Sequence, residues 1–424
     1  NAKTFITNNV DLIRYYDGTC IKYLNTNLTS KPTGIYTTYD ITKALHVVAY
    51  RERLVLLSYT QNGVPAFNAA AWSVAGDPLD FTNGEFAIAP TSDNIRSIGL
   101  INFDLVVDMQ GTTWVLRYTN DAFAPFRWDR INNTWRHDAP YSGINYDTYM
   151  TSVGKPAITS SNAVNVYRID EIIPDFTFTN MDQNSLSVCY GERFDDFKEG
   201  WLCFPSVENS SNAVIRSDSV LAYNYLDETY AVYDFPFSCL GFGRVSRNLT
   251  WGDIQQKWQD YDVPWGSSFL QDNRIIDLAG DHNGNVFELG TGNTLGDGTT
   301  PVTMNVITKN FNPYVEEGEL ARFGYLDLYV NVVNETKLRV QFYINDEMDD
   351  NYTTYYLEQT ITFTPNNNGN ETKEWKRIYV GAVGQIHTIR LYQDPSDFTS
   401  ETLDQPVKIN SMVLWMKRAG RIYS

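Results

Sequence analysis

Apolar and polar residues in the first two thirds of the chain follow the pattern of short β-strands separated by tight polar turns. Residues 98–135 show it most completely. The apolar run 105–107 is of the kind that a strand buried on both faces needs, and 114–118 and 126–130 are rich in aromatic and β-branched residues. Between the first two runs, residues 108–111 predict a turn whose last residue, a glycine, can take a positive φ. We therefore predict an antiparallel meander.

The same pattern recurs along the chain with different residues. Aromatic residues that hold equivalent places in the recurring strands lie 44 to 64 positions apart, namely Tyr15, Tyr59, Tyr118, Tyr167, Tyr223 and Phe287. A loose period close to the roughly 40–50 residues of a propeller blade favours radial repetition over a sandwich. We predict a β-propeller of about five to seven irregular blades over residues 1–295. Helical spacing is nearly absent, and only residues 255–261 suggest a short helix.

A change of composition to Gly, Thr and Asn at residues 292–301 indicates a domain boundary. Beyond it the alternation becomes very regular, with Leu326, Leu328, Val330 and Val332 on one face of a strand. This period of two predicts half-buried antiparallel strands, roughly eight in number, that form a β-sandwich over residues 296–424. The predicted fold is thus all-β, a propeller followed by an antiparallel sandwich.

The formal net charge is −18. A chain of this charge repels phosphate backbones, so we expect no broad nucleic-acid-binding face. The four cysteines, Cys20, Cys189, Cys203 and Cys239, have neither C-x-x-C spacing nor nearby histidines, which argues against a zinc site. Apolar neighbours of the last three indicate buried, reduced thiols. No apolar run approaches the roughly 18 residues of a membrane span.

Residues 281–285, Asp-His-Asn-Gly-Asn, resemble the start of a calcium loop, with Asp281, Asn283 and Asn285 at alternate positions. The segment lacks a bidentate acid at the right distance and flanking helices. It lies between two predicted strands, where Asp, Asn and Gly are typical of a turn. We prefer the turn, and expect neither a metal nor a cofactor.

Candidate catalytic groups are scattered. His46, His137, His282 and His387 form no recognisable Ser/His/Asp or metal-binding set in the sequence. Two carboxylates facing each other across a propeller axis could run glycoside hydrolysis, and Asp195 or Asp196 with Glu208 are as good a choice as any other pair. The sequence therefore assigns no catalytic residue.

Two other segments have a functional and a structural interpretation. Residues 126–128, Phe-Arg-Trp, could stack on a sugar or a base, yet aromatic residues of strands are usually core or interface. Residues 290–293, Gly-Thr-Gly-Asn, lack the lysine and the helix that follow a phosphate-binding loop. Neither segment predicts a ligand.

Several phrases of the sequence resemble a known family. They are WSVAGDPLDF at 72–81, WVLRYTND at 114–121, DLAGDHNGNVFEL at 277–289, and TKNFNP at 308–313 leading into RFGYLDLYV at 322–330. In these the chain is similar to tail-hub and nozzle proteins of tailed, podovirus-like phages, the family called tail tubular protein B or packaged-DNA stabilisation protein. The resemblance covers most of the chain but contains no site motif, so no functional residue is carried over.

The resemblance implies a non-enzymatic virion protein, assembled in the host cytoplasm. A propeller with accessory β domains would form a homo-oligomeric ring of about six copies below the portal, next to the head-to-tail adaptor and tail fibre proteins. The ring would retain packaged double-stranded DNA and conduct it at infection without binding it specifically. An acidic lumen fits this role, because carboxylates do not hold DNA.

Two alternatives stay open. The chain could be a propeller that binds or hydrolyses host surface polysaccharide, with the C-terminal sandwich as a carbohydrate module. It could also be a plain interaction scaffold outside any virus. Fold class alone does not choose among these functions.

Overall fold

The fold is taken from a computed structural model of the 424-residue chain. The structure describes residues 3–24, 27–28, 39–81, 83–121, 124–155, 157–207, 215–248, 271–290, 301–332, 334–345, 352–364, 372–398 and 407–421. The chain divides into two compact units, residues 1–289 and 290–424. The boundary predicted at 295 lies in residues 291–300, outside the described ranges, as does the predicted helix at 255–261.

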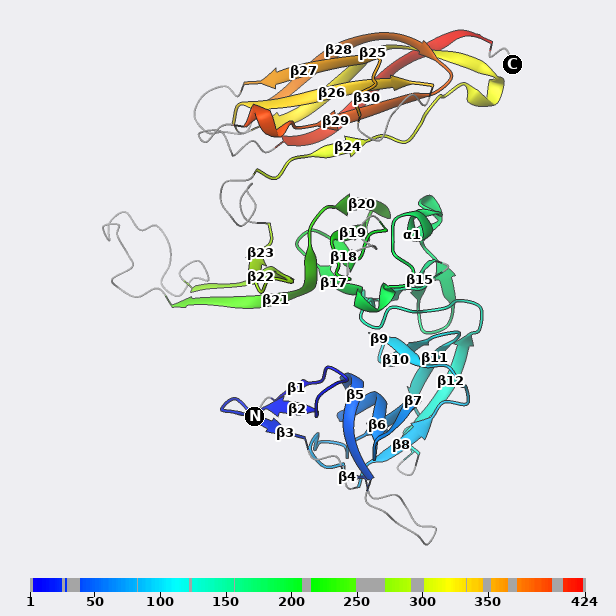
Figure 1. The fold of residues 1–424 in the computed structure, drawn as a ribbon, viewed down its shortest axis with the longest axis vertical. Coiled ribbons are helices and arrows are strands. Elements are labelled where there is room, and N and C mark those ends of the chain that lie inside the picture. Colours follow the sequence, from blue (N-terminus) through cyan, green and yellow to red (C-terminus); the bar gives the residue numbers. More distant parts are fainter. Residues whose placement is uncertain are drawn as a thin grey trace. The chain divides into compact units, whose positions relative to one another are not determined.

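The first unit consists of antiparallel sheets in which each strand pairs with its neighbours in the sequence (Figure 1). The described residues form six such sheets. Their strands are β1 (Thr4–Ile6), β2 (Arg14–Tyr16) and β3 (Ile21–Tyr23); β4 (Asn27–Leu28), β5 (Tyr39–Tyr50), β6 (Arg53–Gln61), β7 (Val64–Trp72) and β8 (Glu85–Ile88); β9 (Ile95–Ile101), β10 (Asp104–Met109), β11 (Thr113–Tyr118) and β12 (Phe126–Asn132); β13 (Ile144–Asn145), β14 (Met150–Val153), β15 (Ile158–Ser161) and β16 (Val166–Arg168); β17 (Tyr190–Phe194), β18 (Glu199–Phe204), β19 (Ser219–Asn224) and β20 (Thr229–Tyr233); and β21 (Phe237–Asn248), β22 (Gln271–Asp281) and β23 (Val286–Glu288).

The middle strands of these sheets are buried on both faces. In β6, Leu54 and Leu56 belong to one apolar core, whereas Val55 and Leu57 belong to another. Successive side chains of a strand point to opposite faces, so a continuous apolar run fills two cores at once. The runs that predicted buried strands are explained by this arrangement.

Each core lies between sheets that follow one another in the chain. Val106 of β10 packs with Met150 of the next sheet, and its neighbour Val107 packs with Trp72 of the preceding one. In β18, Leu202 packs with Val153 of the preceding sheet and Cys203 packs with Phe237 of the next. Consecutive sheets therefore stack face to face. A propeller requires in addition that the first and last sheets close a ring, which stays a prediction.

The meander strands predicted in the first unit are present, but the conformation predicted for the glycine of its turn is wrong. The meander of residues 98–135 is present as β10–β12, preceded by β9. Leu186–Val188 is a 3-10 helix, and β17 starts at Tyr190. Gly111 does not have a positive φ; a Cβ there would lie 3.2 Å from the Asp93 carboxylate. Short helical segments are Asp170–Ile172 and α1 (Phe176–Thr179).

The second unit has two antiparallel sheets around one core (Figure 1). One sheet has the strand order β24-β29-β26-β27 and the other β28-β25-β30. The strands are β24 (Asn305–Ile307), β25 (Glu319–Val332), β26 (Thr336–Ile344), β27 (Leu357–Phe363), β28 (Thr372–Gly384), β29 (His387–Tyr392) and β30 (Val407–Arg421), with 3-10 helices at Val315–Glu317 and Pro395–Asp397.

The alternation of apolar and polar residues that predicted the strands of the second unit agrees with which of their side chains are buried. Leu326, Leu328, Val330 and Val332 of β25 are at most 1% exposed and lie in the core with residues of both sheets. Each sheet thus buries one face, as sheets packed in two layers do. Seven strands occur in the described residues, where roughly eight were expected.

Candidate functional site

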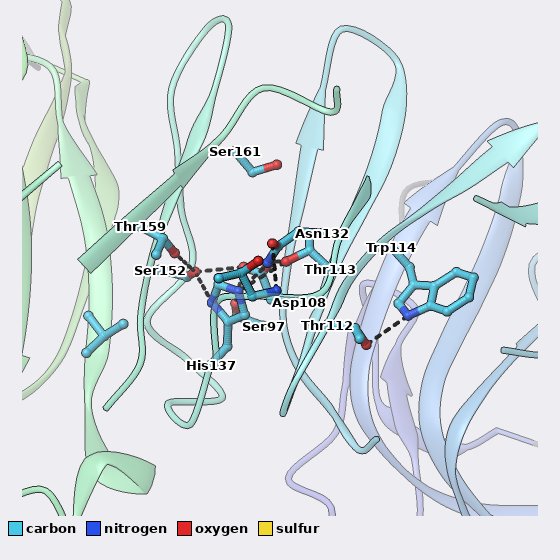
Figure 2. Close-up of polar contacts among 12 residues, drawn as sticks. Ser97, Asp108, Thr112, Thr113, Trp114, Asn132, His137, Ser152, Thr159 and Ser161 are labelled. Atoms are coloured by element: carbon cyan, nitrogen blue, oxygen red, sulfur yellow. Dashed lines mark hydrogen bonds and ion pairs between the residues drawn. The ribbon is translucent and has the colours of Figure 1, made fainter. Parts of the chain in front are cut away.

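A cluster of buried polar side chains lies where the sheet β9–β12 meets the sheet β13–β16 (Figure 2). It consists of Ser97 from β9, Asp108 from β10, Thr113 from β11, His137 from the segment after β12, and Ser152 from β14. All five residues are at most 2% exposed. We call it the Asp108 cluster.

The carboxylate of Asp108 accepts three hydroxyl hydrogen bonds. Ser152 Oγ donates to Oδ2 over 2.7 Å, and Ser97 Oγ donates to the same oxygen over 3.1 Å. Thr113 Oγ1 donates to Oδ1 over 3.0 Å. These donors replace the water that the charge loses on burial, which is the condition for a carboxylate to be tolerated inside a protein.

The ring of His137 lies against the same hydroxyl groups. Its Nδ1 is 2.9 Å from Ser152 Oγ, and its Nε2 is 3.1 Å from Thr113 Oγ1 and 3.4 Å from Asp108 Oδ1. Burial lowers the pKa of His137 below its ordinary value, although Asp108 and Asp138 oppose the change. The ring is therefore neutral at pH 7. The ring nitrogen that carries the proton decides whether Ser152 or Thr113 accepts a hydrogen bond from His137.

The Asp108 cluster contains the residue types of a hydrolytic triad without its geometry. In a triad the histidine stands between the serine and the acid, and the serine oxygen is open to substrate. Here Ser152 bonds directly to Asp108, and no member of the set is accessible. The cluster is therefore a set of structural hydrogen bonds that joins two successive sheets.

His46 makes a second polar link between successive sheets. It lies on β5, and its Nε2 hydrogen bonds to the backbone carbonyl of Arg96 on β9. Its ring meets that of Tyr141 edge to face, with centroids 5.7 Å apart. Burial lowers the pKa of His46 to about 4. The ring is thus a neutral donor at pH 7.

The other histidines are not part of a site. His387 in the second unit donates from Nε2 to the carbonyl of Ala321 over 3.0 Å and is buried. His282 is exposed in the turn between β22 and β23. Among the described residues no group of three or more His, Cys, Asp or Glu side chains could hold a metal ion.

The segment 281–285, which resembles the start of a calcium loop but was predicted to be a turn, is a turn held by its own amides. Asp281 Oδ1 accepts the backbone N–H groups of Asn283 and Asn285 over 2.8 and 2.9 Å, and Oδ2 accepts the side-chain amide of Asn285 over 2.8 Å. Gly284 has a φ of 90°. Because amide donors already surround this carboxylate, the residues form a hairpin turn, in keeping with the preferred interpretation.

The predicted carboxylates take up different environments. Arg193 donates to Asp195 over 2.7 Å and to Asp147 over 3.0 Å, and the Tyr225 hydroxyl donates to Asp195 over 3.1 Å. Asp195 is therefore an ion-pair partner on an exposed turn. Asp196 is exposed beside it. Glu208 lies outside the described residues, so a pairing with it stays a prediction.

Two carboxylates that the sequence did not single out have perturbed titration. Burial raises the pKa of Glu192 on β17, and the nearby charge of Asp277 adds to the rise. Burial likewise raises the pKa of Asp277 on β22, with Asp196 and Asp195 contributing. A carboxyl group whose pKa is raised can act as a general acid. They lie on strands of successive sheets, so no sequence spacing could have shown them.

The remaining candidates are structural. Phe126 lies in the core, with its ring centroid 5.2 Å from that of Tyr50 and 4.9 Å from that of Trp72. Trp128 donates to the carbonyl of Ala87 over 3.3 Å. Residues 291–293 of the glycine-rich segment are outside the described ranges.

The four cysteines are free thiols. Cys189 and Cys203 are buried as predicted, whereas Cys239 is exposed, contrary to the prediction. Its neighbours Phe237 and Leu240 are in the core, but the register of β21 shifts between Phe237 and Cys239 and alters which face each residue occupies.

A cavity of about 20 Å³ lies between the sheet β13–β16 and the sheet β17–β20, lined in part by Tyr146, Tyr223 and Tyr230. This is room for a single water molecule and far less than the roughly 300 Å³ of a small ligand site. The cavity is a small gap between packed sheets and is too small for a substrate.

No family model matches this chain, and no curated protein matches it. Similar solved structures include an exported protein of Bacteroides fragilis, with 10% identity over 54% of this chain and 69% of its own and a TM-score of 0.26. They also include a protein named glycoside hydrolase, with 9% identity, 95% and 90% coverage, and a TM-score of 0.27. At these TM-scores neither likeness supports an activity or a fold for this chain.

Removing the acceptor of the Asp108 cluster should destabilise the first unit strongly. Asp108→Ala leaves three buried hydroxyls and His137 short of a partner, and breaking a buried network of this kind costs about 3–5 kcal/mol. Asp104→Ala is the matched control on the same strand, because its ion pair with Arg117, at 3.9 Å, is partly exposed and worth about 1 kcal/mol or less. Urea unfolding of both variants measures the difference.

Equal losses for the two variants would contradict the structural role of the Asp108 cluster. A Ser152-dependent hydrolysis of an activated ester would instead make the cluster catalytic. Ser152→Ala provides that readout when it is assayed under conditions in which circular dichroism shows it to be folded.

His46 should make the fold sensitive to acid. Unfolded chains take up a proton at this residue below about pH 6.5, whereas the folded state does so only below about pH 4. Stability is therefore lost as the pH falls through this window, by about 3 kcal/mol in total. His46→Gln keeps a donor for the Arg96 carbonyl and does not titrate.

Between pH 7 and pH 4 the free energy of unfolding should fall by about 3 kcal/mol less in His46→Gln than in the parent chain. Urea unfolding at the two pH values measures it. The same pH dependence in both proteins would show that His46 is already protonated, or solvated, in the folded state.

Proposed function

We propose that this chain is a structural protein of a phage tail, a hub or nozzle subunit that forms a homo-oligomeric ring around the DNA channel. The ring retains packaged DNA and conducts it at infection. This proposal starts from the sequence phrases that resemble tail-hub and nozzle proteins. The segment 277–289 spans the hairpin of β22 and β23, and the segment 72–81 starts at the last residue of β7.

The observation that carries the proposal is the stack of meander sheets in the first unit. Each pair of consecutive sheets shares a core, as in the pairs joined by Val106 and Met150 or by Cys203 and Phe237. Radial closure of such a stack gives a propeller, which leaves only short, protected edges. A propeller followed by a two-sheet unit is the organisation that the family resemblance implies.

The internal polar groups support a structural role over catalysis. The Ser, His and Asp side chains of the Asp108 cluster are used entirely in joining two sheets. The net charge of −18 supports a surface that DNA passes without being held, because release of counterions from phosphate requires cationic groups. No helix in the described part of the chain is long and apolar enough to cross a bilayer.

Cryo-EM of phage particles whose genome encodes this chain tests the proposal. We expect a coaxial ring of this protein, of about six copies, around a DNA-sized channel and adjacent to the adaptor. Copies placed on peripheral fibres, or a particle without the chain, would overturn the proposal.

A second candidate function rests on Glu192 and Asp277. A carboxyl group whose pKa is raised can serve as the general acid of a glycoside hydrolase that acts on host surface polysaccharide. If this candidate is correct, Glu192→Gln or Asp277→Asn should slow hydrolysis about 100-fold or more, with the exposed Glu171→Gln as the matched control. Reducing-end release from polysaccharide measures it, and a parent chain without turnover rejects this candidate while leaving the tail proposal intact.

A further inference from the structure

The sheet β28-β25-β30 of the second unit buries one face in the core and leaves the other uncovered in the described structure. Tyr325, Trp375, Tyr379 and Trp415 lie on the uncovered side and are 42–58% exposed. Tyr325 is opposite both Tyr379 and Trp415 in the ladder, and Trp375 is opposite Tyr329. We call this side of the sheet the outer face.

The rings of the outer face are held in place before any partner binds. Trp375 stacks on Tyr329 with centroids 4.8 Å apart. Arg377 forms a two-point ion pair with Asp327 at 2.6 and 2.7 Å, and the Trp415 indole N–H donates to Asp327 over 2.8 Å. A surface already ordered in this way loses little side-chain entropy when it is covered.

The charge of the outer face is opposite to that of the whole chain. Register pairing places five cationic side chains on it: Arg322, Lys373, Arg377, Lys408 and Lys417. Between Arg322 and Asn331 of β25, Asp327 is the one carboxylate that the described ladder places on this face, since Glu374 is opposite the inward-facing Val330. The chain as a whole carries −18. Charge complementarity therefore favours an acidic partner, and other copies of this chain provide one.

The other sheet of the second unit, β24-β29-β26-β27, differs because the charge of its cation Arg339 is compensated by neighbouring acids. There Arg339 is paired with Asp394 and Asp397, each at 2.9 Å, so that its charge is compensated on the spot. On the outer face, Lys373 and Lys408 are exposed at one end of the ladder, both opposite Asn331 rather than an acid.

The outer face is large enough for a stable contact. The central strand β25 has 14 residues, so the three-strand ladder is about 46 Å long and 14 Å wide. Its footprint of about 640 Å² approaches the roughly 800 Å² that each partner contributes to a standard interface. Exposed Trp, Tyr and Arg side chains are also the residues that dominate binding energy at interfaces.

We propose that the outer face docks on an acidic surface of a second copy of this chain. Like charges prevent two outer faces from pairing with each other, so the contact is head to tail. Head-to-tail contacts generate rings when the rotation between copies closes. The inference rests on the proposed ring function and assigns the surface that builds the ring.

The aliphatic residues of the same face favour protein over carbohydrate. Val383 and Val413 are 45% and 36% exposed and lie on the outer face by register, beside Arg322 and Asp327 respectively. Sugars gain from aromatic stacking and from hydrogen bonds, whereas apolar contacts between aliphatic groups are typical of protein interfaces. Polysaccharide and DNA are therefore competing outcomes of the test.

Sedimentation velocity and negative-stain microscopy of the purified full chain test the inference. The parent chain should form a closed oligomer. Trp375→Ala with Tyr379→Ala should raise the dissociation constant about 30-fold or more, since two interface anchors are lost. Lys373→Glu with Lys408→Glu leaves the core untouched and should give a similar loss. Tyr356→Ala, also an exposed aromatic at 53% but outside the ladder, should assemble like the parent.

The outcomes distinguish the docking role of the outer face from the proposed ring function. Normal rings from both outer-face variants overturn the inference and leave the ring function standing. A parent chain that stays monomeric overturns both. Monomers that bind polygalacturonate or duplex DNA through Trp375 and Lys373 overturn the inference in favour of that polymer. Thermal unfolding of every variant confirms that assembly was tested on folded protein.

Discussion

Burial of both faces of the middle strands is the constraint on which the first unit depends. Strands such as β6, β10 and β18 send alternate side chains into two different cores. A single one of these sheets could not cover its own apolar surface, because both sides need a neighbour. Stability is therefore shared between consecutive sheets, and the contribution of each sheet depends on the sheets before and after it.

Apolar contacts alone do not fix how one sheet lies on the next, since they have no direction. The Asp108 cluster and His46 add directional bonds at two successive junctions. Buried polar groups of this kind are costly when any partner is missing, which makes other stackings unfavourable. This explains why a Ser, a His and an Asp meet in the interior without an accessible oxygen, and why their presence indicates assembly of the fold and not turnover.

In the second unit, apolar packing and polar interactions lie on opposite faces of each sheet. Its core is apolar and shared by both sheets, whereas its polar chemistry lies outside. On one side the ions compensate one another around Arg339; on the other, cations and aromatic rings stand together around a single ion pair. The first side suits contact with water. The second has the composition and charge of a surface that is covered in an assembly.

The sequence by itself determined many of the strands, because period-two alternation and apolar runs are local properties: β10–β12 of the first unit and β25 of the second were recognisable in it. It did not determine the Asp108 cluster, whose members come from five separate segments, and it assigned Asp108 to a turn although the residue pairs with Thr113 in the ladder. Nor did it reveal the Glu192 and Asp277 pair or the basic outer face. These groups meet only through strand register and sheet stacking, which depend on contacts between residues far apart in the chain.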